Sequence, residues 1–236
     1  AGSAVGAAQY LYYVYHKNSK NSFKNNTQLI RENVYVGPSF SNKQIIEYLD
    51  LKKISYQSFD RDSLLKTTAQ LIADGNVVGW YQGKMEWGPR ALGNRSILAD
   101  PRRADMKDIL NAKIKHRESF RPFAPSILEE YAGEYFEIDV ASPYMLMVVP
   151  VKKPKDIPAV THVDGTGRLQ TVSKDTNPLY YDLISEFKRI TGIPVIINTS
   201  MNVMGEPIVN TPEEAHQMIV KTDMDYIVMG NNIVVK

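Results

Sequence analysis

Residues 177–200 read NPLYYDLISEFKRITGIPVIINTS, and they join a predicted helix directly to a predicted buried strand. The Asn-Pro pair is typical of a helix start, and Gly192 is typical of a helix end. The apolar run IPVII then predicts a strand that is buried in a sheet. Three small polar side chains close the stretch: Asn198, Thr199 and Ser200. The stretch therefore predicts a helix packed on a sheet, with polar groups gathered at a strand end.

Helices and strands alternate in a similar way along the rest of the chain. Amphipathic periodicity and capping residues predict further helices at 4–17, 42–53, 61–75, 100–117, 127–136 and 214–222. Apolar runs and glycine turns predict strands at 33–40, 76–83 and 144–151, and hairpins at 162–172 and 225–236. Asp100 is interpreted as the start of its helix, and Ser126 with Glu129 as a capping box. Because hairpins and helix-linked strands are intermixed, the predicted fold class is α/β (mixed α+β), a mixed sheet with helices packed on it.

The composition is that of an ordinary globular protein, and it excludes several classes of function. Of the 236 residues, 43% are hydrophobic and 23% are charged, and the net charge is +2. Nucleic-acid-binding modules usually have a strong basic excess, so a basic site in this chain has to be a local cluster. The absence of cysteine excludes disulfides, thiolate metal ligands and cysteine nucleophiles. No segment reaches the roughly 18 apolar residues of a membrane span, and the apolar start of the chain is interpreted as a helix and not as a signal peptide. We therefore expect a cytoplasmic protein.

The sequence divides at about residue 60. Residues 1–60 consist of short predicted elements without a core of their own, and they include an Asn-rich loop at 17–28. From residue 61 onward, amphipathic helices and buried strands follow one another without a break. This change predicts a small N-terminal part, 1–60, and a main domain, 61–236.

Polar and basic residues gather where the predicted strands end. In open α/β sheets, ligands usually bind beyond the strand ends, where the loops converge. Arginines beside glycines and hydroxyl donors suit a polyanion such as a nucleoside triphosphate. The four groups are Lys84, Arg90 and Arg95; Lys113, Lys115, His116, Arg117 and Arg121; Arg168; and Asn198, Thr199, Ser200 and Asn202.

Each group also has a purely structural interpretation. The cations from Lys113 to Arg117 can complement the dipole at a helix end. Arg121, which lies in the rigid apolar sequence FRPF, can belong to a structural ion pair. The GTGR sequence that ends at Arg168 can be a plain hairpin turn, and the NTS sequence at 198–200 can be a turn with satisfied hydrogen bonds. The residues alone leave these alternatives open.

Other kinds of site have less support in the sequence. The chain contains neither a P-loop nor a dinucleotide-binding GxGxxG pattern. His162 and Asp164 could share a metal ion, but two ligands are too few, so no metal site is predicted. Glu86 and Glu206 are candidate acids or bases without an assigned partner.

Four sequence motifs together resemble the C-terminal region of the O-carbamoyltransferases of nodulation-factor and antibiotic biosynthesis. In order along the chain, they read GKMEWGPRALGNRSILADPR, IKHRESFRPFAPS, PAVTHVDGTGRLQTV and GIPVIINTSMNVMGEPIV. The resemblance covers about residues 75–236, and it extends more loosely to NVYVGPSFS and to GSAVGAA near the start. Two positions depart from the expected pattern: Lys84 stands in place of arginine, and Met201 in place of phenylalanine.

The resemblance implies one part of a two-part enzyme. The C-terminal part would be a YrdC-like domain, with a twisted mixed sheet and an open basic cavity, that makes carbamoyl-adenylate from carbamoyl phosphate and ATP. The other part would carry a metal, often iron, and pass the carbamoyl group to a hydroxyl. Residues 1–60 would then be a remnant of that transferase domain and its linker. We therefore expect iron only in the transferase domain, and we expect this chain alone not to carbamoylate a final acceptor.

The family's functional positions transfer to this sequence one by one. By resemblance, the cavity for carbamoyl phosphate and ATP is lined by Arg90 of WGPR, Lys115 of NAKIKHR, Arg121 of FRPF, Arg168 of GTGR, and Asn198 and Ser200 of NTS. The expected catalytic residues among them are Lys115, Arg121 and Arg168. The outer candidates are Arg95, His116 and Thr199. Mg²⁺ held through the ATP phosphates, with few protein ligands, is compatible with such a cavity.

The implied chemistry needs no nucleophilic serine or cysteine. Carbamoyl phosphate gives up phosphate and leaves carbamate, whose oxygen attacks the α-phosphorus of ATP and displaces pyrophosphate. Catalysis is then mainly positioning and charge neutralisation. The expected partners are small-molecule substrates and the transferase domain of the same protein, without a membrane or a nucleic acid. Two alternatives stay open: a YrdC-like module that binds RNA or a nucleotide without turnover, and a folded fragment without activity.

Overall fold

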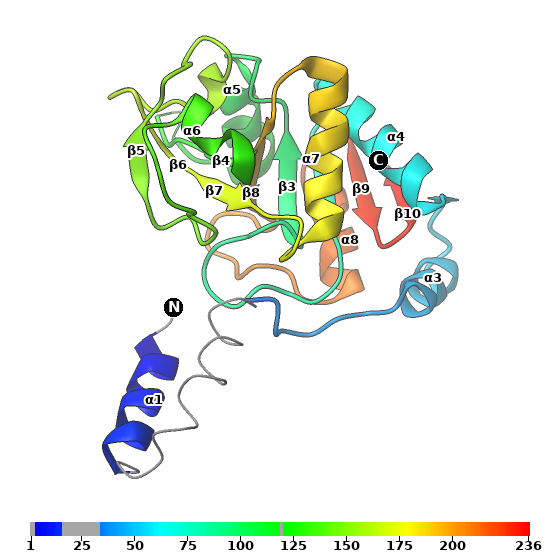
Figure 1. Ribbon diagram of the computed structural model, residues 1–236. Helices are drawn as coiled ribbons and strands as arrows, with labels where there is room; N and C mark the ends of the chain where they lie inside the picture. The colour runs from blue at the N-terminus through cyan, green and yellow to red at the C-terminus, as the bar shows by residue number, and fades with distance from the viewer. Residues whose placement is uncertain (1–2, 16–33, 119) are drawn as a thin grey trace.

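The computed structural model describes residues 3–15, 34–118 and 120–236, so the Asn-rich loop predicted at 17–28 lies outside the described residues. Figure 1 shows a central sheet with helices packed on it, and helices α4 (Arg61–Ala73) and α7 (Pro178–Thr191) lie side by side on one face. The N-terminal helix α1 (Ser3–Tyr15) lies apart from the sheet in the same view. The helix predicted near the N-terminus is thus present.

An eight-stranded mixed sheet forms the centre of the protein. Its strand order is β1-β10-β9-β2-β3-β8-β4-β7, and a separate two-stranded sheet pairs β5 with β6. The β2–β9 and β4–β7 pairs are parallel, and the other neighbouring pairs are antiparallel. The strands are β1 (Gln57–Ser58), β2 (Val78–Tyr81), β3 (Arg95–Ala99), β4 (Ala124–Leu128), β5 (Val148–Pro150), β6 (Thr166–Arg168), β7 (Gln170–Val172), β8 (Val195–Ser200), β9 (Tyr226–Met229) and β10 (Asn232–Val235).

Most helices begin and end at the residues whose chemistry predicts it. The remaining helical elements are α3 (Asn42–Leu51), α5 (Met106–Leu110), the π-helical turn η1 (Asn111–Lys115), η2 (Glu129–Tyr131), α6 (Ala132–Tyr135), η3 (Pro158–Val160) and α8 (Pro212–Lys221). Asn177 caps α7 by accepting a hydrogen bond from the Tyr180 N–H, and Gly192 ends α7 with a φ of 79°. Ser41 and Thr211 form capping boxes at the starts of α3 and α8. These caps satisfy backbone groups that a helix end leaves without partners.

Apolar side chains fill a core layer on each face of the sheet. Ile196 of β8 packs in the layer with Leu183 and Phe187 of α7. Its neighbour Ile197 packs in the opposite layer, which also contains Leu49 of α3. Alternate residues of one strand thus face opposite layers, as the pleat requires. Residues 42–58 pack on the main body as well, because β1 pairs with β10 and Leu49 is fully buried. The division at residue 60 stays a prediction.

The helix start predicted at Asp100 is wrong. The Asp100 carboxylate accepts hydrogen bonds from Arg102, at 2.9 and 2.6 Å, and residues 101–105 form turns. Helix α5 therefore begins only at Met106. The helix still buries an apolar face, since Met106 and Leu110 are fully buried.

The capping box predicted at Ser126 is also wrong. Ser126 is a fully buried residue of β4, and its hydroxyl donates to Gln170 Oε1 at 2.8 Å. The chain reaches η2 and α6 only after this strand, because APSIL pairs with β8 on one side and with β7 on the other. A serine that follows a proline thus serves as a strand residue with a buried partner.

The hairpin predicted over 162–172 has a different pairing. Strand β6 pairs with β5, where Val148 faces Arg168, whereas β7 pairs with β4 in the main sheet. The strand predicted over 144–151 is confined to β5. The described part of 33–40 contains no strand, but Val34 and Gly37 make backbone hydrogen bonds with Trp87 and Met85. Helices in the described parts of the chain are all too short or too polar to cross a lipid bilayer.

Candidate functional site

Strand pairing brings four separate segments to one end of the sheet, which we call the site end. Strands β2 and β8 finish there, and β3, which runs antiparallel to both, begins there. Strand β4 is antiparallel to β8 and parallel to β7, so both β4 and β7 also begin there. The segments are loop 82–94, residues 115–123, Arg168 and its neighbours, and residues 198–202. The six residues predicted for the cavity all lie on these segments.

Loop 82–94 presents Arg90 on the surface of the site end. Arg90 is exposed, whereas the two residues after it, Ala91 and Leu92, are buried. Gly93 has a φ of 107°, and a Cβ at this position would lie 2.3 Å from a ring carbon of Tyr180. Both constraints require glycine. The loop is therefore tightly packed directly after its exposed arginine.

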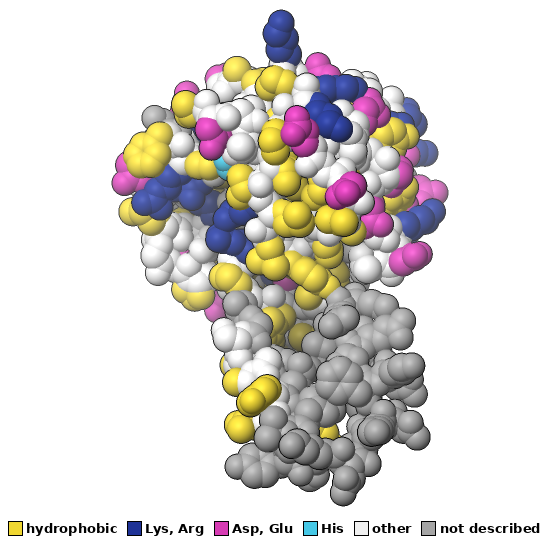
Figure 2. Space-filling view, turned by 60° about the vertical axis from the view of Figure 1, so that its left-hand side comes forward, with side chains coloured by type: hydrophobic (Ala, Val, Ile, Leu, Met, Phe, Trp, Pro, Cys, Tyr) yellow, Lys and Arg dark blue, Asp and Glu magenta, His cyan; other side chains and the backbone are white. Residues whose placement is uncertain are grey.

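Three arginines from three segments lie close together at the site end: Arg90, Arg117 and Arg168. Burial lowers the pKa of Arg168, and the nearby positive charges of Arg90 and Arg117 lower it further. Among the described residues, no carboxylate lies within ion-pair distance of any of the three. The Nε of Arg168 is buried and makes no hydrogen bond with the described residues. Figure 2 shows Lys and Arg side chains gathered in one group on the left of the folded part. Unpaired guanidinium groups in this arrangement suit a phosphate or carboxylate ligand.

Arg117 received no individual role from the sequence. Its Nε donates to Asn111 Oδ1 at 2.8 Å, and its guanidinium lies 4.8 Å from the centre of the Phe123 ring. Burial lowers the pKa of Arg117, the charge of Arg121 lowers it further, and Glu118 opposes this. The position of Arg117 depends on the π-helical turn η1, which the sequence pattern does not distinguish from an ordinary helix end.

Arg121 lies beside this group but in a different electrostatic setting. Its Nε is 3.0 Å from the Glu118 carboxylate, and the side chain is about half exposed. Its backbone carbonyl accepts a hydrogen bond from the Asn111 amide at 3.2 Å. Arg121 thus has the ion pair that the structural interpretation of FRPF expected, while it still adds positive charge next to Arg117.

Lys115 is buried at the site end, without a counter-ion among the described residues. Only 4% of the residue is exposed, and Nζ donates to Ser200 O at 2.5 Å and to Asn202 O and Oδ1 at 2.8 Å. Burial, helped by the charge of Arg117, lowers the pKa of Lys115 to about 7. The ammonium therefore ties η1 to the end of β8. An anion placed nearby would favour its charged form.

The polar end of β8 is divided between a buried and an accessible part. Asn198 is 1% exposed, and its Nδ2 donates to Gln170 Oε1 at 2.9 Å and to Ser126 Oγ at 3.1 Å. Ser200 Oγ donates to Asn202 Oδ1 at 2.7 Å, and both Thr199 and Ser200 are half-buried. Sequence reasoning missed Ser126 and Gln170, because their contact depends on the parallel pairing of β4 with β7.

Of the outer candidates, Arg95 has its guanidinium turned to partners inside the protein. Arg95 is fully buried, and its Nη2 donates to the carbonyls of Pro38 and Gly83 at 3.2 Å. Its guanidinium stacks on Tyr81 at 3.9 Å from the ring centre. His116 is exposed, and it ends the π-helical turn η1 with a φ of 47°. Arg95 therefore forms part of the wall of the site end and is not exposed to a ligand.

An open cavity of 360 Å³ adjoins this region. Burial lowers the pKa of His162 in its wall, Asp164 opposes the shift, and the charge of Arg168 adds to it. His162 Nδ1 and the Asp164 carboxylate both contact the Thr166 hydroxyl, at 3.0 and 2.7 Å, so they belong to one turn. The cavity is lined by Lys107, Phe120, Pro122, Thr161, His162, Val163 and Asp164. Within the described ranges, no three His, Cys, Asp or Glu side chains come together as metal ligands would.

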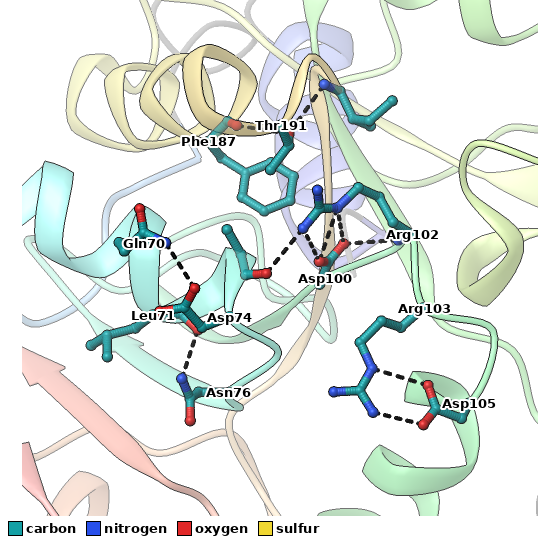
Figure 3. A network of polar contacts seen from close by, with 12 residues as sticks. Gln70, Leu71, Asp74, Asn76, Asp100, Arg102, Arg103, Asp105, Phe187 and Thr191 are labelled. Carbon is teal, nitrogen blue, oxygen red and sulfur yellow. Dashed lines mark hydrogen bonds and ion pairs between the residues drawn. The ribbon is translucent and has the colours of Figure 1, made fainter.

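The opposite end of the sheet, the far end, carries arginines that are paired. Figure 3 shows Arg102 pointing at Asp100 and Arg103 at Asp105. Arg102 Nη2 is 2.6 Å from Asp100 and also donates to Ala73 O at 3.0 Å, while Arg103 Nη2 is 2.7 Å from Asp105. These groups neutralise one another, so Arg102 and Arg103 differ from the arginines of the site end, which have no carboxylate partner in the part of the chain that the structure describes.

Comparison with protein families gives a match over most of the chain. Residues 69–236 match the family described as carbamoyltransferase C-terminus. The chain belongs to this family. The family resemblance that the four motifs indicated is thus confirmed, and this carbamoyltransferase C-terminal domain contains the whole site end.

Curated relatives of this carbamoyltransferase C-terminal domain are much longer proteins. Nodulation protein NolO of Bradyrhizobium diazoefficiens is 49% identical over 210 residues, which cover 86% of this chain and 38% of that protein. A 3'-hydroxymethylcephem-O-carbamoyltransferase of Amycolatopsis lactamdurans is 47% identical over 139 residues, covering 59% of this chain and 26% of that enzyme. The chain therefore spans well under half the length of these relatives.

Among solved structures, full-length HypF in a phosphate- and nucleotide-bound form shares the fold of the domain. The TM-score is 0.51 at 19% identity, and the match covers 75% of this chain and 22% of HypF. The expected YrdC-like fold, a mixed sheet with helices packed on it, is confirmed.

Proposed function

We propose that this domain binds ATP and carbamoyl phosphate at the site end and forms carbamoyl-adenylate. The observation that carries the proposal is the convergence of Arg90, Arg117 and Arg168, from three segments, without a carboxylate partner among the described residues. Like charges repel one another, so such a group is costly unless an anion completes it. ATP and carbamoyl phosphate both supply phosphate oxygens for bidentate contacts with guanidinium groups.

The relatives support the choice of substrates. The cephem enzyme is by its name an O-carbamoyltransferase, and the HypF structure was obtained with phosphate and nucleotide bound. A carbamoyl group must be activated before a hydroxyl can accept it, and an adenylate is one such activated form. We propose that the hydroxyl acceptor binds in a transferase domain outside the residues of this chain, and that iron belongs there as well. Residues 1–60 would connect the two parts in the cytoplasm.

The proposed reaction has two balanced steps. Water hydrolyses carbamoyl phosphate to carbamate and inorganic phosphate. A carbamate oxygen then attacks the α-phosphorus of ATP, forming a C–O–P bond, and the bond from the α-phosphorus to the bridging oxygen of pyrophosphate breaks. Pyrophosphate leaves with the electron pair. Mg²⁺ would bind through the phosphates of ATP.

The residues of the chain contribute position and charge to these steps. Arg90, Arg117 and Arg168 neutralise phosphate oxygens, and their fixed positions lower the entropy cost of holding a polyanion. Lys115 supplies a further cation whose charged form becomes favoured once an anion is near. Asn198 and Ser200 form the polar floor at the end of β8, and Arg121 strengthens the positive potential from the rim.

The test is isothermal titration of ATP, with and without carbamoyl phosphate, into this chain and into Arg168→Ala. We expect binding to the unmodified chain and at least about tenfold weaker binding to the variant, the size of one lost charge-assisted contact. The matched control is Arg103→Ala, which removes an exposed, ion-paired arginine at the far end and should leave the affinity unchanged.

Absence of binding by either ligand, or equal affinities for the unmodified chain and Arg168→Ala, would reject the proposal. A salt-dependent complex with single-stranded RNA that ATP does not displace would favour the RNA-binding alternative. The site end argues against that alternative, because its cations are concentrated in one group and partly buried, whereas RNA modules expose aromatic and basic residues over a wide surface.

A further inference from the structure

The loop that carries Arg90 also contains a buried glutamate, Glu86. Glu86 is 4% exposed, and one of its carboxylate oxygens, Oε1, accepts three backbone hydrogen bonds. The donors are the N–H groups of Leu92 at 2.8 Å, Asn94 at 2.6 Å and Arg95 at 3.1 Å. Backbone N–H groups that converge in this way form an anion-binding nest, which in this protein holds the protein's own carboxylate.

The Glu86 carboxylate is not placed to act as a catalytic acid or base. Oε1 is fully used by the loop, and Oε2 is buried without a hydrogen-bond partner among the described residues. A buried carboxylate with one unsatisfied oxygen is costly, so the protein retains it against a free-energy penalty. The three charge-assisted hydrogen bonds from the N–H groups of Leu92, Asn94 and Arg95 offset part of that cost.

The backbone on both sides of Glu86 is itself fixed by a distant segment. The Met85 N–H donates to Pro38 O at 2.9 Å and the Trp87 N–H to Val34 O at 2.7 Å, while Met85 O accepts from the Gly37 N–H at 3.0 Å. A Cβ at Gly37 would lie 2.9 Å from Met85 O, so the two backbones are in close contact. The carboxylate therefore projects from a rigid base.

Other hydrogen bonds fix the loop directly after Arg90. Ala91 O accepts from Asn198 Nδ2 at 3.3 Å, and Leu92 O accepts from Gln170 Nε2 at 2.8 Å. The Gly93 N–H donates to Ser96 Oγ at 3.1 Å. Arg90 is thus an exposed residue at the start of a backbone segment whose polar groups are tied to the protein interior, and the Glu86 carboxylate is one of their acceptors.

We propose that Glu86 is a positioning residue for Arg90, because its carboxylate fixes the backbone that holds the guanidinium in the arginine group of the site end. This inference rests on the proposed function, in which Arg90 contacts a phosphate. Glu86 acts through the loop and does not touch the ligand. The role requires the negative charge, since a neutral acceptor makes weaker bonds to the same three N–H groups.

The experiment is a double-mutant cycle on this chain, with ATP and carbamoyl phosphate each titrated separately. Arg90→Ala first identifies the ligand whose affinity depends on Arg90. Glu86→Gln, which keeps the size of the side chain and removes its charge, should then weaken that ligand about tenfold, the value of one lost charge-assisted bond. In the Arg90→Ala background, the same Glu86→Gln change should have almost no further effect, because it acts through Arg90.

The matched control is Asp100→Asn, which removes an equally buried carboxylate at the far end of the same sheet. It should lower the unfolding midpoint without changing the affinity. Tyr35→Phe provides a second test if Glu86→Gln does not fold, since it removes a 2.9 Å bond to Leu92 O. We expect it to weaken binding about threefold, and again only when Arg90 is present.

The outcomes separate the two proposals. If Arg90→Ala binds both ligands as well as the unmodified chain does, the proposed use of the arginine group is wrong. If Arg90→Ala weakens binding but the effect of Glu86→Gln is the same in both backgrounds, Glu86 supports only general stability, and the positioning role is overturned. A non-additive cycle, with an unchanged affinity in Asp100→Asn, supports it.

Discussion

The two ends of the central sheet hold arginines in opposite electrostatic surroundings. At the far end, Arg102 and Arg103 each lie within 2.7 Å of an aspartate, and in each pair the two residues are two positions apart in the sequence. At the site end, Arg90, Arg117 and Arg168 come from three separate segments and have no carboxylate partner among the described residues. The arginines of the far end are paired within the folded chain, whereas those of the site end have no carboxylate partner among the described residues, and we propose that an anion completes them.

This difference distinguishes a structural arginine from a binding arginine. Burial lowers the pKa values of Arg117 and Arg168, and nearby arginines lower them further, so the fold opposes the charged forms of these side chains. A bound polyanion reverses both effects at once, because it replaces lost solvation and compensates the charge. Binding of a polyanion would therefore relieve the unfavourable free energy of the charged forms of Arg117 and Arg168 in the folded protein.

The largest expected effect is on catalysis at the site end. Arg117→Ala should lower the rate of carbamoyl phosphate-dependent exchange between ATP and pyrophosphate by about 10²–10³, as for other electrostatic groups in active sites. Arg102→Ala, at the far end, should leave the rate of the folded protein unchanged. Arg121→Ala should lower it less than tenfold, since Arg121 is half exposed and already paired with Glu118. Equal losses in Arg117→Ala and Arg102→Ala would show that the contrast between the ends has no functional meaning.

Several helix boundaries and the buried strand β8 were predictable from local signals, whereas the two neighbours of β8 in the sheet, β3 and β4, were not predicted as strands. Asn177, Gly192 and Thr211 act as the helix boundaries that their chemistry indicates, and the run before Asn198 is a buried central strand. The errors lie where a side chain has a partner other than the one that its helix-cap pattern indicates. Asp100 pairs with Arg102 and does not cap a helix, and Ser126 meets Gln170 inside the sheet. Single-sequence patterns carry no information on such partners.

The site was predictable as a set of segments but not as a set of contacts. Glycine-flanked arginines and polar strand ends indicated the loops that converge. The sequence could not show that Arg95 is fully buried against backbone carbonyls or that Lys115 donates to Ser200 and Asn202. Nor could it assign a role to Glu86, because its three contacts depend on how the backbone from Leu92 to Arg95 folds back onto its carboxylate.

The next effect is a pH dependence of stability from Lys115. Its pKa is lowered to about 7 in the folded protein, chiefly by burial, whereas an unfolded lysine has a pKa of about 10.4. Between these values the unfolded chain binds more protons, so the free energy of unfolding should rise with pH from about 7 to 10. We expect a gain of about 2 kcal/mol between pH 7 and pH 9 in urea unfolding, relative to Lys115→Met.

The control for this measurement is Lys113→Met, which removes a half-buried cation from the same π-helical turn. Its stability should follow that of the unmodified chain at both pH values. Parallel pH profiles for the unmodified chain and Lys115→Met would contradict a lowered lysine pKa. They would also remove the argument that an anion at the site end favours the charged form of Lys115.

A smaller effect is expected from the buried carboxylate at the far end. Asp100 is 1% exposed and pairs with Arg102, which also donates to Ala73 O. Asp100→Asn removes the charge from these bonds and should lower the free energy of unfolding by about 1.5 kcal/mol, the value of a hydrogen bond to a charged group. Urea unfolding gives the value, and titration with ATP should show an unchanged affinity. A loss of affinity would mean that the two ends are coupled through β3.

The smallest effect should come from the exposed pair at the far end. Arg103 and Asp105 are about half exposed, so water and salt screen their attraction, and such pairs contribute less than about 1 kcal/mol. Arg103→Ala should therefore change the urea midpoint only slightly and leave ATP affinity within experimental error. Arg168→Ala makes the same chemical change at the site end, where the guanidinium is half-buried and unpaired among the described residues. We expect Arg103→Ala to change only the urea midpoint, and Arg168→Ala to change mainly the affinity for ATP. This pair of results would establish that carboxylate pairing decides which arginines of this sheet bind anions.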